Sequence, residues 1–178
     1  MLKNVIVTPK KALSLDVATR WNSTYIMIRD AIYYKNAFDR LAKKDKDKYG
    51  HINPSNTEWS NAANISKCLK KFYDVTLLFS GTSYPTANHF FRKFSEIKMA
   101  IARWCDSSDL TICTMAFSMR QKFDKYWEMN NVALAVGAFL DPRYKHRMVE
   151  LYISKMYDID KAELEKLVFM NVINELFT

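Results

Sequence analysis

Glycine and proline are scarce in this chain, which holds three Gly and four Pro among its 178 residues. Tight hairpin turns need Gly or Asn where φ is positive, so a meander of short strands has little turn material here. The scarcity favours long helices. Hydrophobic residues at 49% and aromatic residues at 14% are typical of a globular chain. The length suits one domain with a sizeable core.

Cysteine and histidine are also few, and none of them has the spacing of a metal site. The three Cys and three His form no Cys-x-x-Cys, Cys-x-x-His or His-x-x-x-His pattern, and no Gly-rich phosphate loop exists. The sequence therefore predicts no metal and no cofactor. Cys68, Cys105 and Cys113 lie in helical apolar patterns and are predicted to be reduced thiols of an intracellular protein.

Long apolar runs are missing. The longest, residues 132–140, is too short to span a membrane, and the first residues lack the apolar centre of a signal peptide. We therefore expect a soluble protein with no membrane partner.

Positive charge is in excess, with 27 Lys+Arg against 19 Asp+Glu, a formal net charge of +8. Such a balance suits a polyanion such as nucleic acid, whose phosphates release counterions on neutralisation. The alternative is a solubilising surface. For the run Lys-Lys-Asp-Lys-Asp-Lys at residues 43–48, a solvated helix end is favoured over a binding patch.

Apolar residues that recur every three or four positions predict a mostly α fold of about six helices, with at most a short extended segment near 13–18. The helices are expected to begin near Asn22 or Ser23, Thr57, Pro85, Asp109, Tyr144 and Asp160. The first apolar stripe is expected to end at Leu41. Residues 132–140 are too evenly apolar to distinguish a buried helix from a strand.

The last predicted helix carries a cap and an inward face. Asp160 followed by Glu163 predicts an Asp version of the capping box. Leu164, Val168 and Leu176 are predicted to face the core.

Three ordered segments carry a family resemblance. They read LDVATRWNSTY at residues 15–25, FSGTSYPTAN at 79–88 and LDPRYK at 140–145. Together they resemble hAT-superfamily transposases and their domesticated plant relatives, the RICESLEEPER-like zinc finger BED domain-containing proteins. The resemblance runs from Leu13 to the last residue. It implies the helical insertion domain of an RNase H-like transposase, and a nuclear location.

The resemblance also implies that catalytic residues are missing. In this family two catalytic Asp precede the Arg-Trp pair and a Glu follows the Leu-Asp-Pro-Arg segment by a long interval, and neither region appears here. The family's Cys-x-x-His and BED zinc finger are missing too. We therefore predict no enzymatic activity, a structural role for Asp16, and a helix-boundary role for Asp141, paired with Arg143 or Lys145.

The Arg-Trp pair is the predicted DNA contact. By the resemblance, Trp21 stacks on a displaced base and Arg20 lies beside it, a contact typically worth about 1–3 kcal/mol per base. The alternative is that Trp21 anchors the first helix while Arg20 pairs with Asp16 or caps a carbonyl. Basic residues that could follow the DNA backbone nearby are Lys10, Lys11 and Arg29. A second basic cluster, with a solvated helix start as its alternative, consists of Arg143, Lys145, His146 and Arg147.

These observations predict a leader and extended segment at residues 1–21 and a helical region at 22–178, with a truncated C-terminus. The predicted function is DNA binding by a transposase-like fragment without a small-molecule substrate. The alternative is a helical protein-interaction or oligomerisation module, suggested by the apolar residues at 172–177. The sequence does not separate these from a third hypothesis, a gene fragment with no selected function.

Overall fold

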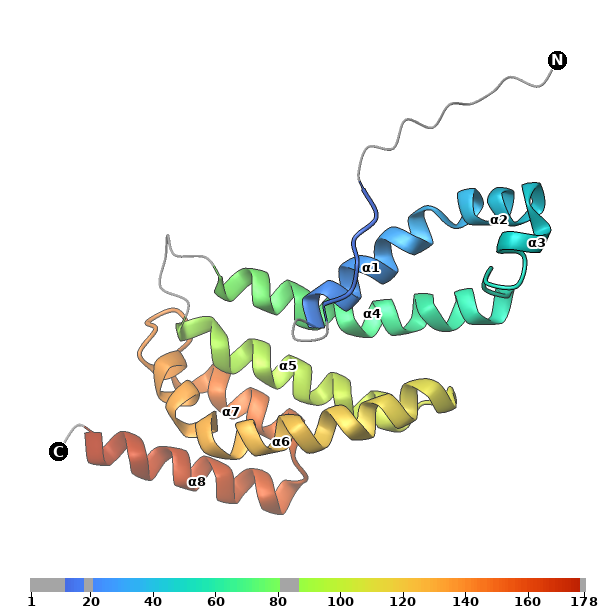
Figure 1. The fold of residues 1–178 in the computed structure, drawn as a ribbon. Helices are drawn as coiled ribbons and strands as arrows, with labels where there is room; N and C mark the ends of the chain where they lie inside the picture. Colours follow the sequence, from blue (N-terminus) through green and yellow to red (C-terminus); the bar gives the residue numbers. More distant parts are fainter. Residues whose placement is uncertain (1–11, 18–20, 81–86, 177–178) are drawn as a thin grey trace. The chain divides into compact units, whose positions relative to one another are not determined.

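The computed structural model describes residues 12–17, 21–80 and 87–176. In this part of the chain every regular element is an α-helix, which confirms the predicted fold class (Figure 1). The helices are α1 (Trp21–Tyr33), α2 (Lys35–Lys44), α3 (Lys46–Tyr49), α4 (Asn56–Phe79), α5 (Ala87–Cys105), α6 (Leu110–Phe139), α7 (Lys145–Met156) and α8 (Ile159–Leu176). Residues 12–17 form no regular element.

The helix count exceeds the predicted six for two local reasons. The first predicted helix is interrupted at Tyr34, whose backbone leaves helical geometry at φ −94° and ψ 10°. The short helix α3 then forms in the charged run, where the Asp45 carboxylate accepts a hydrogen bond from the Lys48 N–H at 3.2 Å. After the interruption at Tyr34, Leu41 is exposed, contrary to the prediction, and its neighbour Ala42 is buried.

The chain divides into two compact units, Met1–Tyr73 and Asp74–Thr178, with the boundary inside α4. Unit 1 has a small aromatic core. The Tyr25 and Tyr73 rings lie 4.7 Å apart, and the Phe38 and Trp59 rings lie 6.1 Å apart. Cys68 is buried in this unit.

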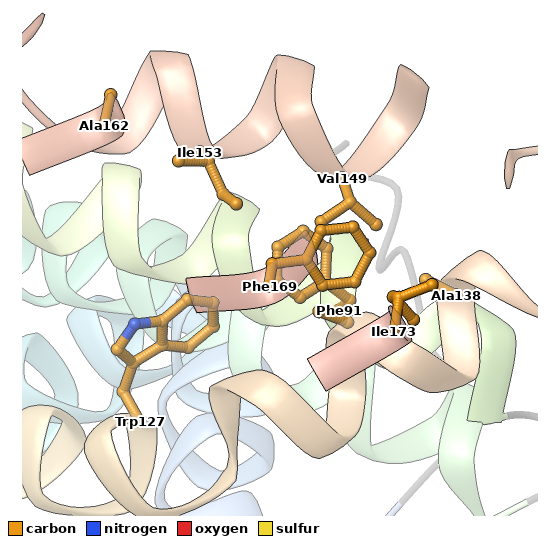
Figure 2. Close-up of a cluster of buried hydrophobic side chains, with 9 residues drawn as sticks. Phe91, Trp127, Ala138, Val149, Ile153, Ala162, Phe169 and Ile173 are labelled. Carbon is orange, nitrogen blue, oxygen red and sulfur yellow. The ribbon is translucent and has the colours of Figure 1, made fainter. Parts of the chain in front are cut away.

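Unit 2 has the larger core, formed by α5, α6, α7 and α8 (Figure 2). Its buried residues are Phe91, Trp127, Ala135, Ala138, Val149, Ile153, Ala162, Phe169 and Ile173. The indole N–H of Trp127 donates to the Tyr157 hydroxyl at 2.8 Å, which satisfies a polar group inside this core. Cys105 is buried and Cys113 half-buried in this unit.

Helix α6 resolves the ambiguous apolar stretch. It runs without interruption through residues 132–139, where Ala135 and Ala138 are buried. At its start the Asp109 carboxylate accepts hydrogen bonds from the N–H groups of Thr111 and Ile112, as predicted for a cap. The helix ends where Asp141 and Pro142 follow.

Helix α8 faces its core with a different stripe from the predicted one. Leu164 and Leu176 are each 60% exposed and Val168 is 41% exposed, whereas Ala162, Phe169 and Ile173 are buried. The helix carries apolar residues on both sides, and the side with Phe169 packs inward, where its ring meets Phe139 at 6.0 Å.

The predicted cap of α8 is also wrong. The Asp158 carboxylate, not that of Asp160, accepts a hydrogen bond from the Lys161 N–H at 2.9 Å. Asp160 lies within the first turn, where a negative charge favours the positive end of the helix dipole. No helix in the described ranges is both long and apolar enough to cross a membrane.

Candidate nucleic-acid interface

Residues 16 and 17 are hydrogen-bonded to the first turn of α1, mainly through one carboxylate. Asp16 Oδ1 accepts hydrogen bonds from the Ser23 and Thr24 hydroxyls, each at 2.8 Å. The Val17 N–H donates to Ser23 Oγ at 2.8 Å. These hydroxyl contacts, that of Ser23 first, lower the pKa of Asp16 below its usual value. Asp16 therefore has the structural role that was predicted for it.

Arg29 belongs to a second anchor in α1. Its Nη2 lies 2.8 Å and its Nε 3.1 Å from Asp30 Oδ1, while the Ser14 hydroxyl donates to Asp30 Oδ2 at 2.9 Å. Asp30 is 6% exposed, so this carboxylate needs a cation beside it. The hydrogen bond to Asp30 raises the pKa of Arg29. A DNA contact by Arg29 stays a prediction, and its ion pair gives it a structural role as well.

The other predicted contact residues are not covered by the structure. Arg20, Lys10 and Lys11 lie outside the described residues, and so does the side chain of Trp21. Helix α1 begins at Trp21. The stacking role of Trp21 and its alternative as a helix anchor both stay predictions.

Charge is divided unequally between the two units. Unit 1 holds 14 Lys and Arg against 6 Asp and Glu, a net charge of +8, whereas unit 2 holds 13 of each and is neutral. The entire positive excess of the chain therefore lies in unit 1. A domain with such an excess attracts the phosphates of nucleic acid.

Carboxylates are also used differently in the two units. In unit 1, five of the six acidic residues accept hydrogen bonds from hydroxyl, amide or backbone N–H groups, and these are Asp16, Asp30, Asp39, Asp45 and Glu58. Asp30 also pairs with Arg29. In unit 2 several carboxylates pair with cations: Glu96 with Arg92 and Lys93, Asp124 with Lys98 and Arg120, Asp141 with Arg143, and Glu163 with Lys166. Asp109 and Asp158 of the same unit accept backbone N–H groups instead. Most acidic residues of unit 1 therefore accept hydrogen bonds from neutral groups.

The second predicted basic cluster is partly neutralised. Arg143 places Nε and Nη2 on Asp141, with Nη2 at 2.8 Å from Oδ2, which confirms the predicted pairing. Asn88, from the start of α5, donates its amide to the same carboxylate. His146 and Arg147 are exposed on α7. The hydrogen bonds of Arg143, and then of Asn88, hold the pKa of Asp141 well below its usual range.

Among the residues that the structure describes, no three or more His, Cys, Asp or Glu side chains come together as a metal-ligand group.

Two family models match the chain. One, described as hAT-like transposase, RNase-H fold, matches residues 88–178, and the other, described as ZBED1 RNase-like helical domain, matches residues 1–68. No solved structure matches the chain significantly.

Several curated plant proteins are similar over nearly the whole chain. A putative AC transposase of Zea mays is 49% identical, over 94% of this chain and 21% of that protein. The zinc finger BED domain-containing proteins RICESLEEPER 1 of Oryza sativa subsp. japonica and DAYSLEEPER of Arabidopsis thaliana are 34% and 32% identical, over 94% and 99% of this chain. The chain spans 23% and 25% of those two proteins, so it matches about a quarter or less of each relative.

Proposed function

Because this chain belongs to the hAT-like transposase family with an RNase-H fold, we propose that it is a DNA-binding helical module that holds DNA mainly through its phosphates. The observation that carries the proposal is the placement of the whole net charge of +8 in unit 1. A transposase acts on DNA, and two similar proteins are named as putative AC and AC9 transposases. A nuclear location follows from the same proposal.

We propose further that the module reads little sequence. Lys and Arg contacts to phosphate position a protein on the duplex without distinguishing bases. The Arg20–Trp21 pair is proposed as the exception, with Trp21 stacking on a displaced base and Arg20 beside it. Stacking of this kind tolerates any base, because every base has a π-face.

Strand transfer is not proposed for this module alone. Asp16 and Asp141, for which structural and helix-boundary roles were predicted, both have hydrogen-bond partners: Asp16 has two hydroxyls, and Asp141 has Arg143 and Asn88. Incubation of the purified chain with duplex or hairpin DNA and Mg²⁺ or Mn²⁺ should therefore leave the DNA uncut, and cleavage would refute this part of the proposal.

A salt titration with fluorescence anisotropy tests the binding itself. The affinity of the intact chain for a short labelled duplex should fall steeply between about 50 and 200 mM salt, because each neutralised phosphate releases counterions. An affinity that does not change over this range would contradict phosphate binding.

In the same assay Trp21→Ala should weaken binding to a duplex with an unpaired base more than to an intact one, by about 5-fold or more if a stacked base is lost. Trp21→Phe is the control, since it keeps an aromatic face.

A second candidate function is protein interaction. On α8 the apolar side chains Leu164, Leu167, Val168 and Leu176 are all exposed. Exposed apolar residues on one helix suit contact with another protein or a second copy. Size-exclusion chromatography with light scattering distinguishes the two functions. A tight oligomer that is lost in Leu164→Ser or Leu176→Ser, without any DNA affinity, would favour this candidate.

A further inference from the structure

Three basic residues of α2 lie on one side of the helix, and two of them belong to the charged run 43–48, for which a solvated helix end is the favoured interpretation. Arg40, Lys43 and Lys44 follow one another at spacings of three and one, which brings them to one side of the helix. All three are exposed. The opposite side carries Phe38, whose ring lies 6.1 Å from Trp59, and the buried Ala42. We name Arg40, Lys43 and Lys44 the α2 basic face.

The charge of this face is not balanced locally. Within the described residues no ion pair joins Arg40, Lys43 or Lys44 to a carboxylate. The nearest acidic residues in sequence are occupied otherwise: Asp39 accepts a hydrogen bond from the Asn53 amide at 3.0 Å, and Asp45 caps α3. Helix α3 follows with Lys46 and Lys48 against Asp47, all exposed, and so adds one net positive charge.

Lys35, the remaining basic residue of α2, has a structural contact within unit 1. Lys35 Nζ lies 3.3 Å from Asn56 Oδ1 and 6.0 Å from the centre of the Trp59 ring. It therefore helps to fasten α2 to α4 within unit 1. Among the described residues the α2 basic face has no such contact, and its three side chains are exposed.

We propose that the α2 basic face is the main phosphate-binding surface of unit 1 and lies along the backbone of double-stranded DNA. The inference rests on the proposed DNA-binding function and assigns it to three residues. Residues 40 to 44 span about 6 Å along a helix axis, and one strand of B-DNA carries a phosphate about every 3.4 Å along its axis. Three long cationic side chains at this spacing can neutralise successive phosphates without contacting a base.

A structural role is the competing explanation. Lys43 and Lys44 lie in the last turn of α2, where positive charge favours the negative end of the helix dipole. Such a role would be visible in stability and helix content, and it would leave DNA affinity unchanged once folding is intact. The two explanations therefore predict different measurements.

The test compares two triple variants of the full chain that remove the same charge from the same unit. One variant is Arg40→Gln, Lys43→Gln and Lys44→Gln on the α2 basic face. The other is Lys67→Gln, Lys70→Gln and Lys71→Gln on α4, all exposed. For each, anisotropy with a labelled duplex gives the slope of log affinity against log salt, and circular dichroism and thermal unfolding report folding.

We expect the α2 variant to make the slope shallower by about 2.7, which is 0.9 for each of three lost phosphate contacts, and the α4 variant to change it by less than about 1. Equal changes in the two variants would overturn the inference, because the charge of unit 1 as a whole would then decide binding. An unchanged slope in the α2 variant would overturn it too, while steep salt dependence of the intact chain would keep the proposed function. An intact chain that binds no DNA would refute both.

Two further variants keep the test decisive if the α2 triple unfolds. The single changes Lys43→Gln and Lys44→Gln should each reduce the slope by about 0.9. A charge-preserving pair, Lys43→Arg with Lys44→Arg, should keep the slope of the intact chain. Loss of slope in that pair would contradict a phosphate role, since both cations can contact a phosphate oxygen.

Discussion

Asp141 is a buried carboxylate that links the end of α6 to the start of α5 in unit 2. It is 7% exposed, follows the end of α6, and accepts hydrogen bonds from Arg143 and from Asn88 at the start of α5. A carboxylate removed from water in this way is stable only while it keeps such partners. Its pKa is lowered well below the usual range, mainly by the hydrogen bonds from Arg143.

This lowered pKa has a consequence for the dependence of stability on pH. A carboxylate whose folded pKa lies below its unfolded value of about 3.9 stabilises the fold above that value, and the stabilisation is lost as pH falls toward the folded pKa. We expect Asp141→Asn to lower the urea midpoint at pH 7 and to make the fall in stability below about pH 4 shallower. Urea unfolding followed by circular dichroism at several pH values between 7 and 2 measures both effects.

Asp106→Asn provides the control for Asp141→Asn, because Asp106 is an exposed carboxylate in the turn before α6. It should leave both the midpoint at pH 7 and the pH profile close to those of the parent chain. If Asp141→Asn gives the parent profile as well, then Asp141 does not link protonation to folding.

Single residues also show what sequence reasoning could reach. The pairing of Asp141 with Arg143 was predictable because the two lie two positions apart. The hydrogen bond from Asn88 was not, since 53 positions separate it from Asp141 and only the packing of α5 brings it there. The buried Asp30 was missed for a similar reason, as its partner Ser14 lies 16 positions away in a segment without regular structure.

At the scale of elements, α8 shows the limit of apolar periodicity. The helix carries Leu164 and Val168 on one side and Phe169 and Ile173 on the other, so two stripes of helical spacing coexist. Spacing alone gives no reason to prefer either stripe. The structure buries the one with Phe169, whose large ring fills the space against Phe139.

Two substitutions of similar size separate the two faces of α8. Ile173→Ala should lower the free energy of unfolding by about 2–5 kcal/mol, because it opens a cavity at a residue that is 5% exposed. Leu164→Ala, at a residue that is 60% exposed, should change it by no more than about 0.5 kcal/mol. Chemical denaturation of the two variants gives both values. The reverse order would restore the stripe expected from sequence.

In α6, by contrast, a local signal was sufficient to predict where the helix begins. Asp109 was predicted as a cap from its position before an apolar pattern, and its carboxylate accepts two backbone N–H groups. The helical state of residues 132–139 was not predictable, since this stretch is too evenly apolar to distinguish a helix from a strand. Their helical state reflects packing in the core of unit 2, where Ala135 and Ala138 are buried among α5, α7 and α8.

At the scale of the whole molecule, composition was enough to predict the fold class. It was not enough to predict how charge is divided between the two units. Scarce Gly and Pro and repeated apolar spacing predicted a helical chain. The unit boundary at Tyr73 and Asp74 lies inside α4, a helix that contains neither Gly nor Pro. No sequence signal marks that point, so the contrast between a basic unit and a neutral one emerges only from the structure.

The neutrality of unit 2 leads to a prediction about the intact chain. Changing three exposed lysines of this unit, Lys122, Lys125 and Lys155, to Gln removes as much charge as the α2 triple does. Counterions are released only where protein cations neutralise phosphates, and at about 0.15 M salt an exposed charge is screened beyond about 8 Å. The salt slope for duplex binding should therefore change by less than about 1, although the net charge of the chain falls from +8 to +5. A slope reduced as much as in the α2 triple would mean that binding follows total charge, and the division between the two units would then have no part in DNA binding.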